Sequence, residues 1–202
     1  MLKPVSQPCL RNQEPIYQKL KLHFKSPGAV LELACGTAQH AVYFSQRMPH
    51  LAWQPSDIAD AIKSSNMWIS EAALINLKPA LKLDVTKEPW PVGEYDYIYC
   101  ANLIHFVSAL SVGKIFNGIN SHLKQDGRVA IYGPFNNHGF TSEGNKNLDA
   151  WLKSDVNPAA GIKELEEIKI LAERHNLRLD TNESMPANNH LLIFKRLLKH
   201  SL

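Results

Sequence analysis

Short apolar runs alternate with amphipathic stretches along most of the chain. Runs rich in branched and aromatic residues predict strands over 29–34, 51–57, 80–84, 95–104 and 127–135. Between them, apolar residues recur at helical spacing over 37–48, 58–74 and 111–123. Strands and helices that alternate at these lengths predict an open, mostly parallel sheet wrapped by helices on both faces.

The last quarter of the chain breaks this alternation. Two helices, predicted over 147–154 and 162–176, precede two strand-like runs, 177–184 and 190–197, which a five-residue turn-rich link separates. Such a short link joins neighbouring antiparallel strands. The sequence therefore predicts an α/β, Rossmann-like fold whose seven-stranded sheet is mostly parallel, with an antiparallel last strand.

A further helix is expected before the first strand. Ile16, Leu20 and Phe24 recur at helical spacing, and Pro15 suits the first position of a helix. We expect the N-terminal segment, residues 1–25, to cap the site formed at the strand ends. At 202 residues the chain favours a single domain, 1–202. Pro55 is unfavourable inside a central strand, so we place it at the exit of its strand.

Composition and charge narrow the class of protein. The formal net charge is +3 and resides at the two ends of the chain, so it is weak evidence for nucleic-acid binding. No apolar run approaches a membrane span, and neither the three cysteines nor the nine histidines have metal-ligand spacing. We expect a cytoplasmic protein with a small-molecule partner and no metal, nucleic acid or membrane. Its oligomeric state is not indicated.

The first predicted strand ends in a turn of small residues. In "VLELACGTAQH", Glu32 lies at the strand's end, and Ala34, Gly36 and Ala38 follow where a dinucleotide-binding turn usually has glycines. The helix that opens near Thr37 directs free amides at an anion. A carboxylate beside this turn favours an ammonium or sulfonium over a pyrophosphate. S-adenosylmethionine, with both cations and one carboxylate, therefore suits the turn better than NAD. The alternative is a solvated Glu32 beside residues that merely pack the helix.

Two more acidic residues end the next predicted strands. Asp57 lies 21 residues after Gly36, a separation suited to a carboxylate that binds both ribose hydroxyls, with Ile58 beside it. Asp84 could accept the exocyclic amine of adenine while Val85 covers the ring edge. Each Asp could instead cap a helix or a turn. The argument rests on the row that they form with Glu32.

The fourth predicted strand ends in "YCANLIHF". Asn102 and Leu103 would border the methionine end of the cofactor, and His105 would face the open part of the cleft. A histidine there could take a proton from an attacking hydroxyl or amine, or bond the substrate. A purely structural histidine is an equal alternative.

These residues together resemble the class I S-adenosylmethionine-dependent methyltransferases, and more closely the family of methyltransferase-like protein 26, whose substrate is not assigned. The matching stretches cover nearly the whole chain: "RNQEPI", "LELACGTAQHAVYF", "WQPSDI", "LDVTKEPWP", "CANLIHF", "YGPF", "TSEGN" and "MPANN". The resemblance implies the methyltransferase fold and an S-adenosylmethionine site.

The resemblance also raises questions at particular residues. The family's turn usually reads Ala-Ser-Gly-Thr-Gly, and we expect the methyl group of Ala38 to crowd the cofactor and weaken its binding. Asn12 is expected to bond cofactor or substrate, or else to anchor an N-terminal cap. Asn188, Asn189 and the loop 140–145 are candidates for the acceptor pocket.

The leading hypothesis is an S-adenosylmethionine-dependent methyltransferase that acts on a small molecule by direct in-line transfer, with S-adenosylhomocysteine as product. A protein that binds the cofactor as a sensor or scaffold, without catalysis, is the alternative. An NAD(P)-dependent oxidoreductase is disfavoured by Glu32 and by the absence of G-x-G-x-x-G.

Overall fold

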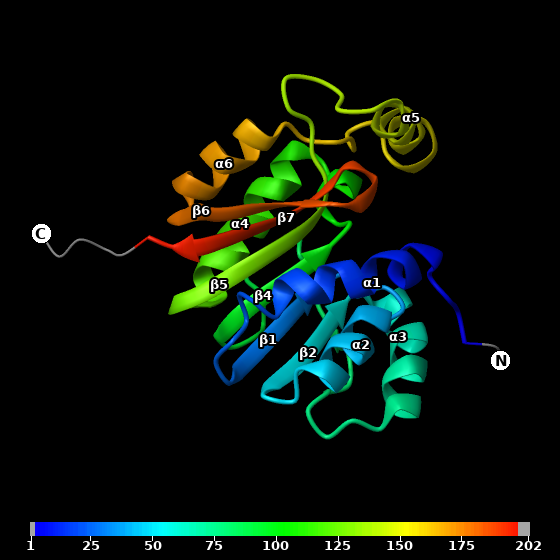
Figure 1. Ribbon diagram of the computed structural model, residues 1–202, viewed down its shortest axis with the longest axis vertical. Coiled ribbons are helices and arrows are strands. Elements are labelled where there is room, and N and C mark those ends of the chain that lie inside the picture. The colour runs from blue at the N-terminus through cyan, green and yellow to red at the C-terminus, as the bar shows by residue number, and fades with distance from the viewer. Residues whose placement is uncertain (1–2, 198–202) are drawn as a thin grey trace, which may run out of the picture.

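Seven strands form one mixed sheet in the order β3-β2-β1-β4-β5-β7-β6 (Figure 1). The computed structural model describes residues 3–197, so the outermost residues of the predicted domain, 1–2 and 198–202, lie outside it. The strands are β1 (Gly28–Leu33), β2 (Leu51–Asp57), β3 (Leu81–Lys82), β4 (Tyr95–Ala101), β5 (Leu123–Pro134), β6 (Leu177–Met185) and β7 (Asn189–Arg196). β7 runs antiparallel to both β5 and β6, and the other pairs are parallel, as predicted.

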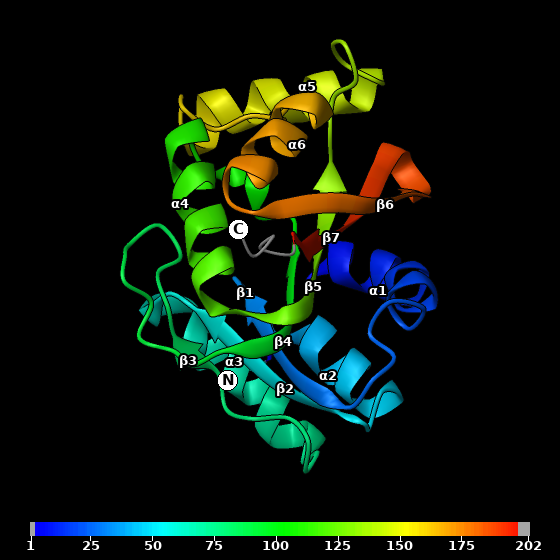
Figure 2. The same ribbon diagram turned by 90° about the vertical axis from the view of Figure 1, so that its left-hand side faces the viewer.

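Six α-helices accompany the sheet in the described part of the chain. They are α1 (Gln7–Leu20), α2 (Gln39–Arg47), α3 (Ala59–Ala72), α4 (Ala109–His122), α5 (Glu143–Trp151) and α6 (Leu165–Arg174). Side chains of α1, α2 and α3 pack on one face of the sheet, and those of α4 and α6 on the other. Figure 2 shows α4 and α6 on one side of the sheet and α1 and α2 on the other. Both faces are therefore covered, and the strands β1, β4, β5 and β7 contribute apolar side chains to both.

Strand order places the site. β1 lies between β2 and β4. The chain adds β2 and β3 on one side of β1 and then returns to add β4 on its other side, so the strand order reverses between β1 and β4. In open sheets of this kind, ligands bind beyond the carboxyl ends of the strands at such a switch point. The ends of β1 and β4 carry Glu32 to Ala38 and Ala101 to His105, respectively.

The prediction for the N-terminal helix was wrong about where it starts. α1 begins at Gln7, and Pro15 lies in its interior. The actual start has its own signals: the Ser6 side chain accepts from the Cys9 amide, and a proline, Pro8, falls in the first turn. A proline is compatible with the first turn of a helix and only tolerated further in. Periodicity alone favoured the wrong proline.

Pro55 also lies elsewhere than predicted, because β2 continues past it to Asp57. The Trp53 amide, two residues earlier, donates away from β1 to the carbonyl of Asn76. Pro55 faces the same side, where β3 begins only at Leu81, opposite Ser56. The missing N–H of Pro55 therefore removes no ladder hydrogen bond.

Two other boundaries differ from the prediction. β3 has only two paired residues, so Asp84 follows the strand in a turn instead of ending it. The helix expected over 147–154 begins earlier, at Glu143, because the Ser142 side chain accepts from the Asn145 amide and starts α5 there. α5 continues as one π-helical turn, Leu152–Val156.

Candidate functional site

The turn after β1 is held in a strained backbone by its neighbours. Ala34, Gly36 and Ala38 all have positive φ, at 51°, 57° and 62°. The Gly36 amide donates to Asp57 Oδ2 over 2.7 Å, and the Gly36 carbonyl accepts from Ser65 Oγ on α3 over 2.6 Å. A carboxylate on β2 and a hydroxyl on α3 therefore fix both backbone groups of Gly36. Such over-determined strain is typical of functional turns.

Gly36 leaves space that a side chain would fill. A Cβ at this position would meet no protein atom within 4 Å, although the backbone around it is tightly bonded. The open side faces a cavity of about 510 Å³, here named the Glu32 cavity, which is lined by Ser6, Cys9, Glu32, Ala34, Gly36 and Thr37, among others. Its volume lies in the range of small-molecule sites. A ligand can thus reach the Gly36 backbone directly.

Glu32 is a buried carboxylate beside this turn. Its side chain is 2% exposed, and its Oε2 accepts from the indole Nε1 of Trp53 over 2.7 Å. Burial raises the pKa of Glu32 to about 8, against the lowering effect of the Trp53 hydrogen bond. No basic side chain pairs with it within residues 3–197. A bound cation would favour its ionised form.

Asp57 lies behind the turn. Its two oxygens accept from the Gly36 and Ile58 amides, each over 2.7 Å. Burial raises the pKa of Asp57, and these two hydrogen bonds oppose the rise. Asp57 therefore orders the turn, and its remaining lone pairs are available to a ligand. The neighbouring Ile58 is half exposed at the start of α3.

Asp84 is engaged in a turn of its own. Its Oδ1 accepts from the hydroxyl and amide of Thr86 over 2.6 and 3.1 Å, and Lys87 Nζ lies 2.9 Å from Oδ2. These contacts, the Thr86 hydroxyl first, lower the pKa of Asp84. Val85 is buried in the core beside it. Of the three acids, Glu32 and Asp57 lie near the ends of β1 and β2, whereas Asp84 lies in the turn after β3. Among the described residues, Glu32 alone of the three lines the cavity.

Ala38 is fully buried in the cluster formed by α1, α2 and the sheet, and is not among the described residues that line the Glu32 cavity. This position argues against the expected steric penalty, which stays a prediction for a binding experiment. The glycine that is usual in the family at this position is explained by the backbone, because Ala38 has a left-handed conformation that glycine adopts without strain.

A second cavity adjoins the first. It has a volume of about 580 Å³ and is named here the His105 cavity. Pro8, Asn102 and Phe106 line both cavities, so the two share a wall. Asn102, at the end of β4, has a φ of 55° and directs the chain into the 3₁₀ turn Ile104–Phe106. Leu103, predicted at the cofactor, is buried in the core instead of lining either cavity.

His105 is 4% exposed and lines the second cavity. Burial, with a smaller contribution from the nearby Lys163 cation, lowers the pKa of His105 to about 4. Lys163 is held by the carbonyls of Val107 and Gly161, over 2.9 and 2.7 Å. Within residues 3–197 no group hydrogen-bonds the imidazole of His105. The ring is therefore neutral near pH 7, and a ligand can use its nitrogens.

Asn12 ties α1 to the sheet. Its Oδ1 lies 2.7 Å from His40 Nε2, and His40 Nδ1 lies 3.2 Å from the hydroxyl of Tyr99. Because the Asn12 oxygen only accepts, His40 donates from Nε2 and accepts from Tyr99. Burial lowers the pKa of His40 to about 4, which keeps this pattern. Asn12 lines the His105 cavity and not the Glu32 cavity.

Sequence reasoning missed several residues of the two cavities. Tyr132 at the end of β5 and Trp151 at the end of α5 line the His105 cavity, and Phe106 contacts Trp151 edge to face with ring centroids 6.3 Å apart. Only Tyr132 had a usable signal, because it ends a predicted strand. Of the acceptor-pocket candidates, Asn189 lines the cavity, whereas Asn188 and the loop 140–145 do not.

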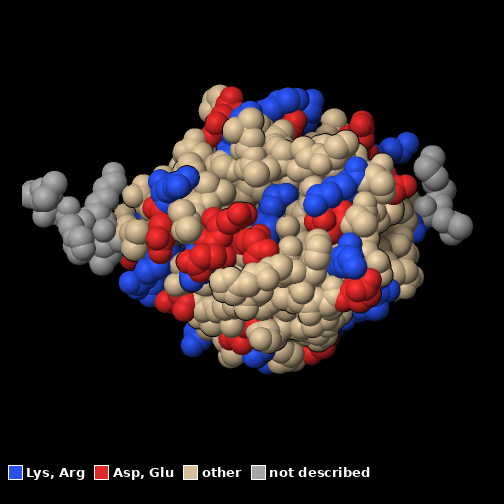
Figure 3. All heavy atoms as spheres, turned by 90° about the horizontal axis from the view of Figure 1, so that it is seen from above, with Lys and Arg blue, Asp and Glu red and all other residues tan. Residues whose placement is uncertain are grey.

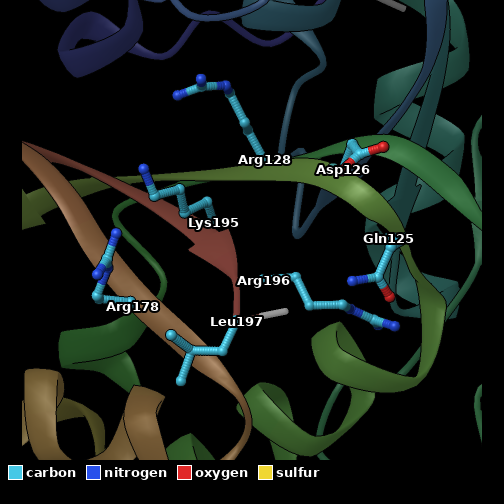
Figure 4. A pocket seen from close by; sticks show the side chains of 8 residues that line it. Gln125, Asp126, Arg128, Arg178, Lys195, Arg196 and Leu197 are labelled. Carbon is cyan, nitrogen blue, oxygen red and sulfur yellow. The ribbon is translucent and has the colours of Figure 1, made fainter. Parts of the chain in front are cut away.

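A third cavity lies at the opposite edge of the sheet and is basic (Figure 4). Arg128, Arg178, Lys195 and Arg196 line it, and Asp180 pairs with Arg128 and Lys195 over 3.0 and 2.5 Å.

The face seen in Figure 3 carries basic and acidic side chains side by side. Within the described residues, no group of three or more potential metal ligands and no helix long and apolar enough to cross a membrane occurs.

Solved structures that are similar to this chain include methyltransferases. Human N-acetylserotonin methyltransferase in complex with SAM matches with a TM-score of 0.80 at 12% identity, over 95% of this chain and 53% of that one. CalO1, a methyltransferase in calicheamicin biosynthesis, in its SAH-bound form matches at 0.77 and 15%, over 92% and 53%. An O-methyltransferase family 2 protein from Planctomyces limnophilus, in complex with apigenin, matches at 0.75 and 19%, over 87% and 52%.

At these identities the likeness shows the fold, which is the Rossmann-like fold of class I methyltransferases. The chain spans about half the length of these three proteins. Its sequence also matches, over residues 3–196, a family described as "Protein of unknown function (DUF938)". The match covers nearly all of the chain, and the protein belongs to this family.

Proposed function

We propose that this protein is an S-adenosylmethionine-dependent methyltransferase that acts on a small molecule. The observation that carries the proposal is the Glu32 cavity, in which an unpaired buried carboxylate and the bare Gly36 backbone face one space. Its fold neighbours include methyltransferases with SAM or SAH bound. The positive charge of the cofactor would pair with the carboxylate of Glu32. The lack of a Cβ at Gly36 would let the rest of the cofactor come close to the backbone.

The Glu32 cavity and the adjoining His105 cavity would have different roles, one for the cofactor and one for the acceptor. Glu32 would hold the positive end of the cofactor, Gly36 and Thr37 would lie under it, and Asp57 would keep the turn in place. When bound, S-adenosylmethionine would supply a methyl group on a sulfonium, open to direct attack. Asn102 and Phe106, shared by both cavities, would bring the acceptor to that methyl group. Positioning of this kind supplies much of the rate in such transfers.

His105 would receive the proton that an acceptor hydroxyl or amine gives up. Its imidazole is neutral and its nitrogens are unengaged within the described residues, so it is able to accept a proton. We also propose a relation to the family of methyltransferase-like protein 26. A reducing, cytoplasmic setting, which is consistent with the three free cysteines, is part of the same proposal.

One observation favours the alternative, a sensor or scaffold that binds the cofactor without catalysis. No carboxylate orients His105 within residues 3–197, and a pKa of about 4 makes it a weak base. To decide, a metabolite extract would be incubated with the protein and S-adenosylmethionine labelled in its methyl group. Transfer of label to a small molecule supports the enzyme, and repeated absence of transfer, with cofactor binding intact, supports the sensor.

Calorimetric titration with S-adenosylmethionine tests the binding site itself. We expect wild type to bind, and Gly36→Ala to bind at least about tenfold more weakly because its methyl group enters the space that the cofactor needs. The matched control is Gly139→Ala, since Gly139 also has positive φ and open space but lines neither cavity. No binding by wild type, or equal loss in both variants, would contradict the proposed function.

A further inference from the structure

The His105 cavity has an uneven chemistry that points to one kind of acceptor. Among the described residues that line it, Arg11 is the only charged one, and none is an aspartate or a glutamate. Within residues 3–197 Arg11 takes part in no ion pair, although ten other pairs form there. A guanidinium at the mouth of a cavity without carboxylates favours an anion and disfavours a cation.

Arg11 and Tyr132 both line this cavity. Burial raises the pKa of Tyr132, and the Asn12 side chain, followed by the charge of Arg11, opposes that rise. The Tyr132 hydroxyl thus lies within the electrostatic influence of Arg11, near the end of β5. Arg11 precedes Asn12 on α1, and the hydrogen bond between Asn12 and His40 holds this turn of the helix in place.

Another part of the cavity lining is aromatic and exposed. Phe106 and Trp151 are 38% and 47% exposed, although their rings contact each other, and Pro134 and Leu148 continue the apolar lining. Large exposed aromatic side chains beside a cavity provide a stacking surface for a planar ligand. Aromatic walls and a single cation are thus combined in one space of about 580 Å³.

From this combination we infer that the methyl acceptor is an aromatic acid, with its carboxylate at Arg11 and its ring against Phe106 and Trp151. The inference rests on the proposed function, because it names the substrate class of the cavity that adjoins the cofactor site. A bidentate contact from a guanidinium to a carboxylate fixes orientation as well as charge.

The test uses matched probes and does not need turnover. Benzoate, 4-hydroxycinnamate, indole-3-acetate and 2-naphthoate, each paired with its neutral methyl ester, are titrated into full-length protein, by calorimetry and by tryptophan fluorescence. We expect at least one acid to bind about tenfold more tightly than its ester, and Arg11→Gln to remove that preference. Arg11→Lys should retain part of it, which separates charge from fork geometry.

The basic cavity of Figure 4 supplies the control, since it could also attract acids. Arg178→Gln, in that cavity, should leave the preference unchanged. Trp151→Ala should weaken both acid and ester, because the stacking surface serves both. If no acid is preferred over its ester, if Arg11→Gln keeps the preference, or if Arg178→Gln removes it, the inference is overturned.

The outcome is separable from that of the proposed function. Binding of S-adenosylmethionine without any preference for acids rejects the aromatic acid and leaves the methyltransferase proposal standing. An Arg11-dependent preference in a protein that binds no S-adenosylmethionine keeps the ligand class of the cavity and rejects the methyltransferase proposal.

Discussion

Glu32 is the residue at which charge and burial conflict most directly. With a pKa raised to about 8, it is mostly protonated near pH 7 in the free protein. A cation in the Glu32 cavity favours the ionised form, so binding should release a proton. Below the pKa of Glu32, the affinity for S-adenosylmethionine should therefore rise with pH, by up to about tenfold per unit between pH 6 and 7.5.

This prediction is checked by calorimetry in two buffers of different ionisation heat, which counts the protons released. The range stops at pH 7.5 because an α-amino group, with a pKa of about 7.7–8.0, loses most of its charge above it. Glu32→Gln keeps an acceptor for the Trp53 indole but has no proton to release. Its affinity should be lower and nearly independent of pH, whereas a pH dependence equal to that of wild type would rule out Glu32 as the cation's partner.

Ala38 gives a second prediction for a single residue. Its methyl group is buried in the core, away from the Glu32 cavity, so Ala38→Gly should leave the affinity for S-adenosylhomocysteine within about twofold. Relief of the left-handed strain, about 1 kcal/mol, is offset by the loss of a buried methyl group of similar worth. The melting temperature should change little. A tenfold gain in affinity would restore the original expectation that this methyl group crowds the cofactor.

Among the elements, α1 is the one that the sequence predicted least well and on which the site depends most. Hydrophobic spacing found the helix through Ile16 and Leu20, but its first eight residues, Gln7 to Glu14, have few apolar positions. Those residues supply Pro8, Arg11 and Asn12 to the cavities. Their places depend on contacts with His40 and Gln39, more than 25 residues away, and local patterns carry no information about such contacts.

Asn12→Ala tests how firmly α1 is held. The substitution leaves the Nε2–H of His40 buried without its acceptor, and we expect the free energy of unfolding to fall by about 1–3 kcal/mol. Urea denaturation measures the change. Gln18→Ala, on the exposed side of the same helix, is the control and should stay within about 0.5 kcal/mol of wild type. Equal stability of the two variants would show that the bond to His40 contributes nothing.

For the whole molecule, the sheet was predictable because each strand contains a recognisable apolar run. The length of each connection also indicates whether the strands that it joins are parallel or antiparallel. The antiparallel β7 followed from the short connection after Met185, without any long-range information. The site was predictable only in part. The positions of Glu32 and Gly36 follow from the end of β1, but the turn around Asp84 and the cavity beside His105 arise where segments distant in sequence meet.

The same buried groups shape the stability of the whole molecule against pH. The pKa of each of four histidines is lowered, that of His40 and His105 to about 4, mainly by burial. These rings are neutral when folded but take up protons when unfolded, so they destabilise the fold as pH decreases below about 6.5. Glu32 acts oppositely: its raised pKa means that the unfolded state ionises first, and stability is lost as pH rises from about 4.5 to 8.

Stability of the protein without cofactor should therefore peak near pH 7. At lower pH the histidines of the unfolded chain take up more protons than Glu32 releases, and toward pH 8 their contribution fades while Glu32 still titrates, at a slope of about 1 kcal/mol per pH unit. Urea denaturation between pH 5 and 8 measures the curve. Glu32→Gln should flatten the alkaline side and make the acid side steeper, because Glu32 titrates on both sides whereas the histidines act mainly on the acid side. Saturating S-adenosylmethionine should also counteract the alkaline decline, since its cation replaces the proton on Glu32. A wild-type curve without cofactor that keeps rising from pH 6.5 to 8 would contradict the burial of an unpaired carboxylate.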